Sequence, residues 1–194
     1  MKSEQRILNS SMSKDSGSIF RLLLVVVSAF FMSHAISSAQ PKSLGATFSF
    51  SGFSISYEHR LKDNGSFIET SLKAETAEIF LYRSEIPGVS GSVTWNFPVA
   101  EWTSEEGNHL TFFAGPGVTA GFGNDYKLPY GSFFGLKGRV GVECNFARNI
   151  VISAFLSPII GSHIVFYSDH LTMRYYKYGL MCSLIPEVGI KYRF

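Results

Sequence analysis

The last eight residues of the chain alternate between apolar and polar side chains. The apolar set is Val188, Ile190, Tyr192 and Phe194, and the polar set is Glu187, Gly189, Lys191 and Arg193. Because successive side chains of a β-strand point to opposite faces, this segment predicts a strand with one apolar and one polar face. A soluble sheet can have the same alternation. The aromatic residue at the final position, in a chain that begins with an export signal, favours a strand that faces lipid.

The same alternation runs through most of the chain. It is found in eight segments, at residues 44–51, 53–60, 68–75, 89–97, 110–122, 134–146, 150–157 and 176–194. Short turns separate several of them, as at Asn64-Gly65, where the chain needs the positive φ angles of a hairpin. The pattern predicts an all-β fold: an eight-stranded antiparallel transmembrane β-barrel with up-and-down topology over residues 40–194.

The topology assigns each connection to one side of the membrane. Eight strands bring both ends of the barrel to the periplasmic side, so connections 62–65, 100–108 and 147–149 are expected there. The turn at Gly52 and connections 82–88, 123–131 and 165–174 are expected outside the cell. The last strand is expected to run unbroken from Tyr176 to Phe194 and to extend beyond the membrane with its partner.

Residues 1–39 have the pattern of a secretory signal peptide. Arg21 precedes the apolar run 22–32, and small residues lead to a predicted cleavage site after Ala39. The apolar run is shorter than the roughly 20 residues of a spanning helix, which disfavours the alternative of an uncleaved anchor. Met12 is an alternative start to Met1.

Composition agrees with this interpretation. Hydrophobic residues make up 45% and charged residues 16% of the chain, with 18 Phe and 18 Gly. The formal net charge of +2 is too small to indicate a nucleic-acid partner.

Charged side chains gather on the Gly/Ser/Thr face of the predicted strands. They are Glu58, Arg60, Glu69, Lys73, Glu75, Lys137, Arg139, Glu143, Glu187, Lys191 and Arg193. A soluble lipocalin-like barrel would place its charges outside. In a membrane barrel they line a lumen just wide enough for side chains to fill, where opposite charges must pair. The pattern predicts an ion-pair plug, with a narrow gated channel or a catalytic carboxylate cluster as alternatives.

The signal peptide, the eight alternating segments and the C-terminal residues 190–194 together resemble the small outer-membrane barrels of the OmpA/OmpX type. The resemblance implies an outer-membrane location, lipid as the surrounding partner, and insertion by the barrel-assembly machinery. It also implies that Val188, Ile190, Tyr192 and Phe194 form the C-terminal insertion signal. The protein is expected to be a monomer, and its role to be structural or in surface interactions, because this fold alone does not fix one function.

Enzymes that deacylate or acylate lipid A share this size and strand number and use His with Ser and an acid. Here Ser162-His163 and Ser168-Asp169-His170 lie at the predicted outer end. No local motif of those enzymes accompanies them, so a lipid A-modifying activity is the runner-up and no catalytic residue is assigned. His59 and His109 are too far apart in sequence for a metal site, and no cofactor motif occurs.

Two further expectations concern the outer end and the cysteines. The hairpin formed by the last two strands, rich in tyrosine, is a candidate site for a surface ligand. Cys144 and Cys182 both fall on the lipid-facing set of positions, roughly 20 Å apart along the strands, and are expected to be free thiols.

Overall fold

The computed structural model describes residues 41–61, 65–76, 87–103, 109–126, 128–146, 149–167 and 170–194, all within the compact unit Gln40–Phe194. The predicted signal peptide, with Met1 and Met12, lies outside these ranges. Within them the strands are β1 (Lys42–Ser49), β2 (Gly52–Arg60), β3 (Phe67–Glu75), β4 (Gly88–Thr103), β5 (His109–Asp125), β6 (Leu128–Asn145), β7 (Ile150–Leu156), β8 (Ile159–Phe166), β9 (Leu171–Tyr175) and β10 (Glu187–Arg193). A short helix α3 (Lys177–Met181) and a 3₁₀ turn η2 (Cys182–Leu184) precede β10.

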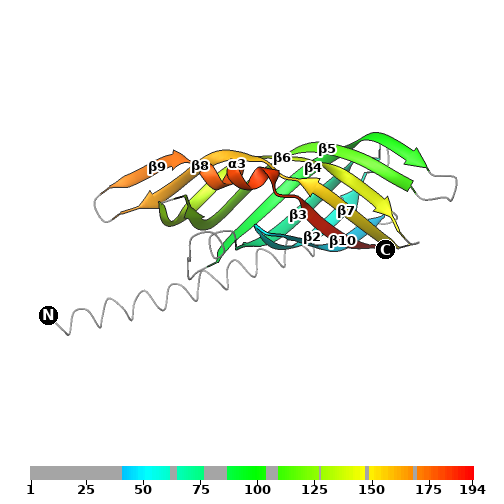
Figure 1. Ribbon diagram of the computed structural model, residues 1–194, viewed down its shortest axis with the longest axis horizontal. Coiled ribbons are helices and arrows are strands. Elements are labelled where there is room, and N and C mark those ends of the chain that lie inside the picture. The colour runs from blue at the N-terminus through cyan, green and yellow to red at the C-terminus, as the bar shows by residue number, and fades with distance from the viewer. Residues whose placement is uncertain are drawn as a thin grey trace, which may run out of the picture. The chain divides into compact units, whose positions relative to one another are not determined.

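Eight of these strands close into a ring (Figure 1). The order is β1-β2-β3-β4-β5-β6-β7-β10, every neighbouring pair is antiparallel, and β10 returns to β1. Ala46 of β1, for example, lies opposite Ile55 of β2 on one side and Ile190 of β10 on the other. The predicted eight-stranded antiparallel barrel is confirmed.

β7 corresponds to the strand predicted over 150–157, and β8, which is not predicted, continues it along β6. Both pair with β6: β7 opposite residues 140–145 and β8 opposite residues 132–137. Pro158 lies between them and has no N–H to donate, but its carbonyl accepts a 2.8 Å hydrogen bond from the N–H of Gly138. The strand is therefore interrupted without leaving β6.

Two predicted connections are partly strand. β4 continues to Thr103, opposite His109 of β5, so residues 100–103 belong to the sheet. At the other end, Asp125 of β5 pairs with Leu128 of β6, so the connection predicted over 123–131 is a tight turn. Pairing of backbone groups does not require alternating side chains, and polar or glycine-rich residues can therefore extend a hairpin.

The prediction of one continuous strand from Tyr176 to Phe194 is wrong. Only β10 belongs to that strand in the ring, while β9 pairs with β8 and α3 and η2 fill the interval. α3 lies against β8 (Figure 1). Tyr176, just before the helix, and Tyr178 within it are 5% and 3% exposed, whereas Leu184 of η2 is 80% exposed. An amphipathic short helix thus reproduces, over a few residues, the alternation that was interpreted as a strand.

A carboxylate on another strand caps this helix. The Asp125 side chain accepts hydrogen bonds from the backbone N–H groups of Lys177 (3.0 Å) and Tyr178 (2.9 Å). The helix has no capping side chain of its own at Tyr176. Asp125 therefore satisfies the N–H groups that a helix start leaves open, and it fastens α3 to the end of β5.

The two faces of the ring differ in the way that the sequence predicts. Large apolar side chains on the outer face are exposed, among them Leu44, Phe48, Ile55, Val93, Phe122, Leu136, Ile152, Val188 and Ile190. Serine, threonine and charged side chains line the buried inner face. Within the described residues no helix is long and apolar enough to span a membrane.

Candidate functional site

Lys191 of β10 is the centre of the barrel interior. Its ammonium donates hydrogen bonds to Glu58 (2.6 Å), Glu69 (2.9 Å) and Glu143 (2.7 Å), which project from β2, β3 and β6. The four side chains are almost fully buried, with Lys191 itself 2% exposed. A single cation therefore connects strands from different sides of the ring through its interior.

Two arginines complete this group. Arg60 binds Glu58 at 2.9 Å and also Glu143, while Arg139 forms an ion pair with Glu69. We call Glu58, Arg60, Glu69, Arg139, Glu143 and Lys191 the central charge cluster. Its three cations balance its three carboxylates, so each charge that leaves water gains an opposite charge in return.

Three phenylalanines pack against the central charge cluster. Phe67, Phe113 and Phe155 are 1%, 1% and 5% exposed and form one buried group. The Arg139 guanidinium lies 3.7 Å from the ring centroid of Phe155 and 5.4 Å from that of Phe113, within the range of cation–π contacts. Two of these buried phenylalanines could have been predicted from the sequence, because Phe113 and Phe155 occupy positions on the polar face of their strands.

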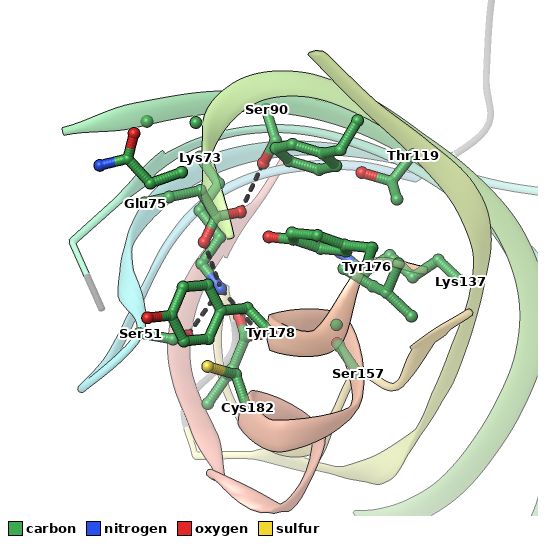
Figure 2. Close-up of a pocket in the computed structure, with 17 residues that line it drawn as sticks. Ser51, Lys73, Glu75, Ser90, Thr119, Lys137, Ser157, Tyr176, Tyr178 and Cys182 are labelled. Atoms are coloured by element: carbon green, nitrogen blue, oxygen red, sulfur yellow. Dashed lines mark hydrogen bonds and ion pairs between the residues drawn. The ribbon is translucent and has the colours of Figure 1, made fainter. Parts of the chain in front are cut away.

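A second charged group surrounds a small cavity between the barrel wall and α3, which we call the outer pocket (Figure 2). Lys73 lies 3.3 Å from Glu187 and 3.5 Å from Glu75, and it donates a hydrogen bond to the Ser51 hydroxyl. Tyr176 stacks on Phe133 at a centroid distance of 4.5 Å and lines the pocket. The cavity volume is about 40 Å³.

The remaining two predicted plug residues have neutral partners. Lys137 donates a 3.0 Å hydrogen bond to the Ser92 hydroxyl, and Arg193 donates a 3.2 Å hydrogen bond to the Asn145 side-chain oxygen. The other nine predicted residues take part in ion pairs, divided between the central charge cluster and the walls of the outer pocket.

The predicted C-terminal insertion signal lies on the outer face. The exposed fractions of Val188, Ile190, Tyr192 and Phe194 are 54%, 56%, 55% and 62%. The strand that carries them is held on both sides, by β1 and by β7.

His163 does not form a catalytic pair with Ser162, the serine beside it. His163 is fully buried, and its Nε2 lies 2.9 Å from the Gly123 carbonyl oxygen. Ser162 is the preceding residue on the same strand and therefore points to the opposite face. His170 stacks on Tyr167 at 4.8 Å, and Ser168 and Asp169 lie outside the described residues.

The structure corrects the placement of one cysteine. Cys182 was predicted on the lipid-facing side of a strand, but it lies in η2 and lines the outer pocket. Cys144 is on β6, and neither cysteine forms a disulfide in the described structure. Among the described residues, no group of three or more His, Cys, Asp or Glu side chains is arranged to hold a metal ion.

Comparison with known proteins gives similarity in structure only. No protein-family profile and no curated protein sequence matches the chain. Among the solved structures that resemble it is a major outer membrane protein of Thermus thermophilus, with 9% sequence identity and a TM-score of 0.45, over 80% of this chain and 100% of that one.

Two further similar structures are of Ail from Yersinia pestis. The protein in a phospholipid bilayer nanodisc has 16% identity and a TM-score of 0.33, over 80% of this chain and 98% of that one. The crystal structure of Ail with the heparin analogue sucrose octasulfate has 14% identity and a TM-score of 0.29, over 80% and 95% of the two chains.

The closed ring of strands and its two faces show what kind of barrel this is. A closed antiparallel ring removes every unpaired strand edge from its wall, which a bilayer demands of any spanning sheet. Its outer face is apolar and its charges are inside, the reverse of a soluble barrel. The chain is an antiparallel β-barrel with eight strands in its ring and the face pattern of a membrane-spanning barrel.

Proposed function

We propose that this barrel does not conduct ions appreciably and that its role is structural or in surface interactions, without enzymatic activity. The central charge cluster is the observation that carries the proposal. The single ammonium of Lys191 connects β10 with β2, β3 and β6. An ion pathway through the lumen would have to separate these groups.

Separation of the cluster is energetically unfavourable. Removing one partner of a buried ion pair leaves an uncompensated charge and typically costs about 3–5 kcal/mol. Three carboxylates share three cations here, and the phenylalanines beside them exclude water from part of the same space. Thermal fluctuation would therefore open the lumen rarely.

Planar-bilayer recording tests the proposal. Purified, refolded protein is expected to leave the conductance of the bilayer at its baseline. A double substitution, Lys191→Ala with Arg139→Ala, should create rare, small openings because it removes two long side chains from the interior. Phe194→Ala, which changes only an exposed position, is the control and should remain silent. Stable, large openings by the unmodified protein would overturn the proposal.

The opposed directions of Ser162 and His163 weigh against a lipid A-modifying enzyme. Lipid mass spectrometry of outer membranes with and without the protein tests this alternative. We expect the same lipid A species in both. A species that loses or gains an acyl chain only when the protein is present would contradict our proposal, and His163 and His170 would be the first residues to substitute.

The β8–β9 hairpin is the part of the barrel best suited to a surface ligand. β9 is the last strand in the sheet order and, among the described residues, pairs with β8 alone. Phe166, Tyr167, Leu171, Met173 and Tyr175 along the hairpin are 44–72% exposed. An open strand edge beside aromatic side chains supports recruitment of a partner strand.

The exposed C-terminal set supports a role in insertion by the barrel-assembly machinery. Phe194→Ala should lower the yield of folded protein in the outer membrane while leaving the stability of the inserted barrel nearly unchanged. The measurement compares the folded fraction in vivo with unfolding after refolding in vitro. Equal yields in vivo would contradict this role.

A further inference from the structure

The outer pocket contains a cation that has no carboxylate partner. The ammonium of Lys137 donates to the Ser92 hydroxyl, and no carboxylate of the described residues lies within 4.0 Å of it. Glu75 and Glu187, the acidic side chains of the pocket, are both engaged by Lys73. Two of the three ammonium N–H groups of Lys137 are therefore available to another acceptor.

A second polar group in the pocket also lacks a partner. The Ser157 hydroxyl is buried, with the residue 8% exposed, and no described residue hydrogen-bonds to it. Figure 2 shows Lys137 and Ser157 entering the pocket from the side opposite Lys73 and Glu75. An ammonium whose described partner is a neutral hydroxyl and a hydroxyl with no described partner, on one side of one cavity, form a pair of donors for a bound acceptor.

We propose that the outer pocket binds one small monovalent anion, of the size of a halide or formate, between Lys137 and Ser157. A negative charge there compensates the Lys137 ammonium, which is otherwise a desolvated cation with a neutral partner. The side of the pocket away from Lys73 is the favourable one, because Glu75, which lies beside Lys73 (Figure 2), repels an anion there.

The size of the cavity limits the ligand. Its volume of about 40 Å³ holds roughly three water molecules, since one needs about 10–15 Å³ by this measure. A sugar, a phosphorylated headgroup or an acyl chain does not fit beneath α3 in this arrangement. The backbone of Gly179 lies close to the Ile159 carbonyl, so α3 leaves little space for enlargement on the β8 side.

A titration by solution NMR tests the site. The protein, isotope-labelled and inserted in nanodiscs, is titrated with potassium bromide that replaces potassium gluconate at constant ionic strength. Gluconate is too large for the cavity. We expect saturable shifts of the backbone amide signals of Lys137, Ser157 and Gly179, and none in a titration of gluconate into a low-salt sample.

Three variants identify the donors. Lys137→Met removes the cation and should weaken bromide binding at least tenfold. The barrel should fold, because the variant removes a partly buried charge whose described partner is a neutral hydroxyl. Ser157→Ala should weaken binding severalfold. Lys177→Met, the same change at an exposed lysine on α3, should leave the binding curve unchanged.

Two results would overturn the proposal. Linear, non-saturating shifts in the unmodified protein would mean that the pocket holds water alone. Equal bromide affinity of the unmodified protein and both pocket variants, Lys137→Met and Ser157→Ala, would place the anion elsewhere. If Lys137→Met does not fold, Ser157→Ala alone decides the test, because it retains every charge of the pocket and should therefore fold.

Discussion

At the scale of single residues, Lys191 connects the most distant parts of the central charge cluster. Its ammonium contacts three carboxylates within 2.9 Å, and its position on β10 alternates with exposed Ile190 and Tyr192. A lysine at this place in the sequence looks like an ordinary polar-face residue. Its partners come from strands far away in the sequence, so the charge balance of the interior depends on closure of the ring.

Lys191→Met should destabilise the barrel by about 3–5 kcal/mol, because it leaves three carboxylates with two arginines. Urea unfolding in lipid vesicles, followed by tryptophan fluorescence, measures the change. Lys177→Met removes the same charge from an exposed position and should stay within about 0.5 kcal/mol of the parent. Equal unfolding midpoints for both variants would mean that the cluster does not stabilise the fold.

Gly52 and Gly91 differ in how much space the structure leaves for a side chain, so the same substitution can be compared at both. At Gly52 φ is +156°, and a Cβ built there would lie 2.1 Å from the carbonyl oxygen of Ala74. At Gly91 the nearest atom to such a Cβ is 4.0 Å away. We therefore expect Gly52→Ala to destabilise the β1–β2 hairpin and Gly91→Ala to be nearly neutral.

The heat-shifted mobility of the folded barrel in detergent gels provides the measurement for this pair. The temperature at which the folded band disappears should fall for Gly52→Ala and remain unchanged for Gly91→Ala. Similar behaviour of the two variants would show that the hairpin tolerates a side chain at its turn.

At the scale of elements, α3 depends on a carboxylate that belongs to β5. Asp125 is fully buried and accepts two backbone hydrogen bonds from the start of the helix. A five-residue helix has little stability of its own, so this cap and the stacking of Tyr176 on Phe133 determine its position.

Asp125→Ala should release α3 and expose Cys182, which lines the outer pocket. In a Cys144→Ser background, the rate of labelling by a water-soluble maleimide should rise severalfold in the Asp125→Ala variant. Glu101→Ala removes an exposed carboxylate on β4 and should leave the rate unchanged. An unchanged rate for Asp125→Ala as well would mean that the cap does not hold the helix.

The elements differ in how well the sequence predicts them. All eight ring strands are predicted from alternation with period two, because one face of each is apolar along its length. The eighth is predicted to start at Tyr176, whereas β10 begins at Glu187. The helix is missed because Tyr176, Tyr178, Leu180, Cys182 and Leu184 continue the alternation of β10, and five residues are too few for a helical period to show. The capping interaction joins residues more than fifty positions apart, so no local pattern contains it.

The candidate site is predicted in part for a similar reason. The alternation along each strand places the charged residues on the inner face of the barrel. It does not show which carboxylate meets which cation. Arg139 of β6 pairs with Glu69 of β3, which is far away in the sequence, and lies over Phe155 of the next strand, β7. Lys137 lies on the same face of its strand as the charged residues near it, and yet its hydrogen-bond partner is a serine. Register and strand tilt, which follow from the closed ring, decide these contacts.

At the scale of the whole molecule, the two faces of the barrel determine the environment in which it is stable. The apolar outer face requires lipid, and the charged inner face is stable only while it excludes water or pairs its charges. Ion pairs, phenylalanines and the outer helix occupy successive parts of the interior. We therefore expect lipid outside the barrel and a closed lumen inside it.

Methyl NMR of the barrel in nanodiscs tests both claims at once. Val151 and Ile152 are adjacent on β7, but Val151 is 1% exposed toward the interior and Ile152 is 39% exposed on the outer face. A nitroxide on lipid acyl chains should broaden the methyl signals of Ile152 and Ile190, while neither it nor a water-soluble gadolinium chelate should broaden those of Val151. Broadening of Val151 by the aqueous probe would contradict the closed lumen. Broadening of Ile152 and Ile190 by the aqueous probe, and not by the lipid nitroxide, would contradict the membrane barrel itself.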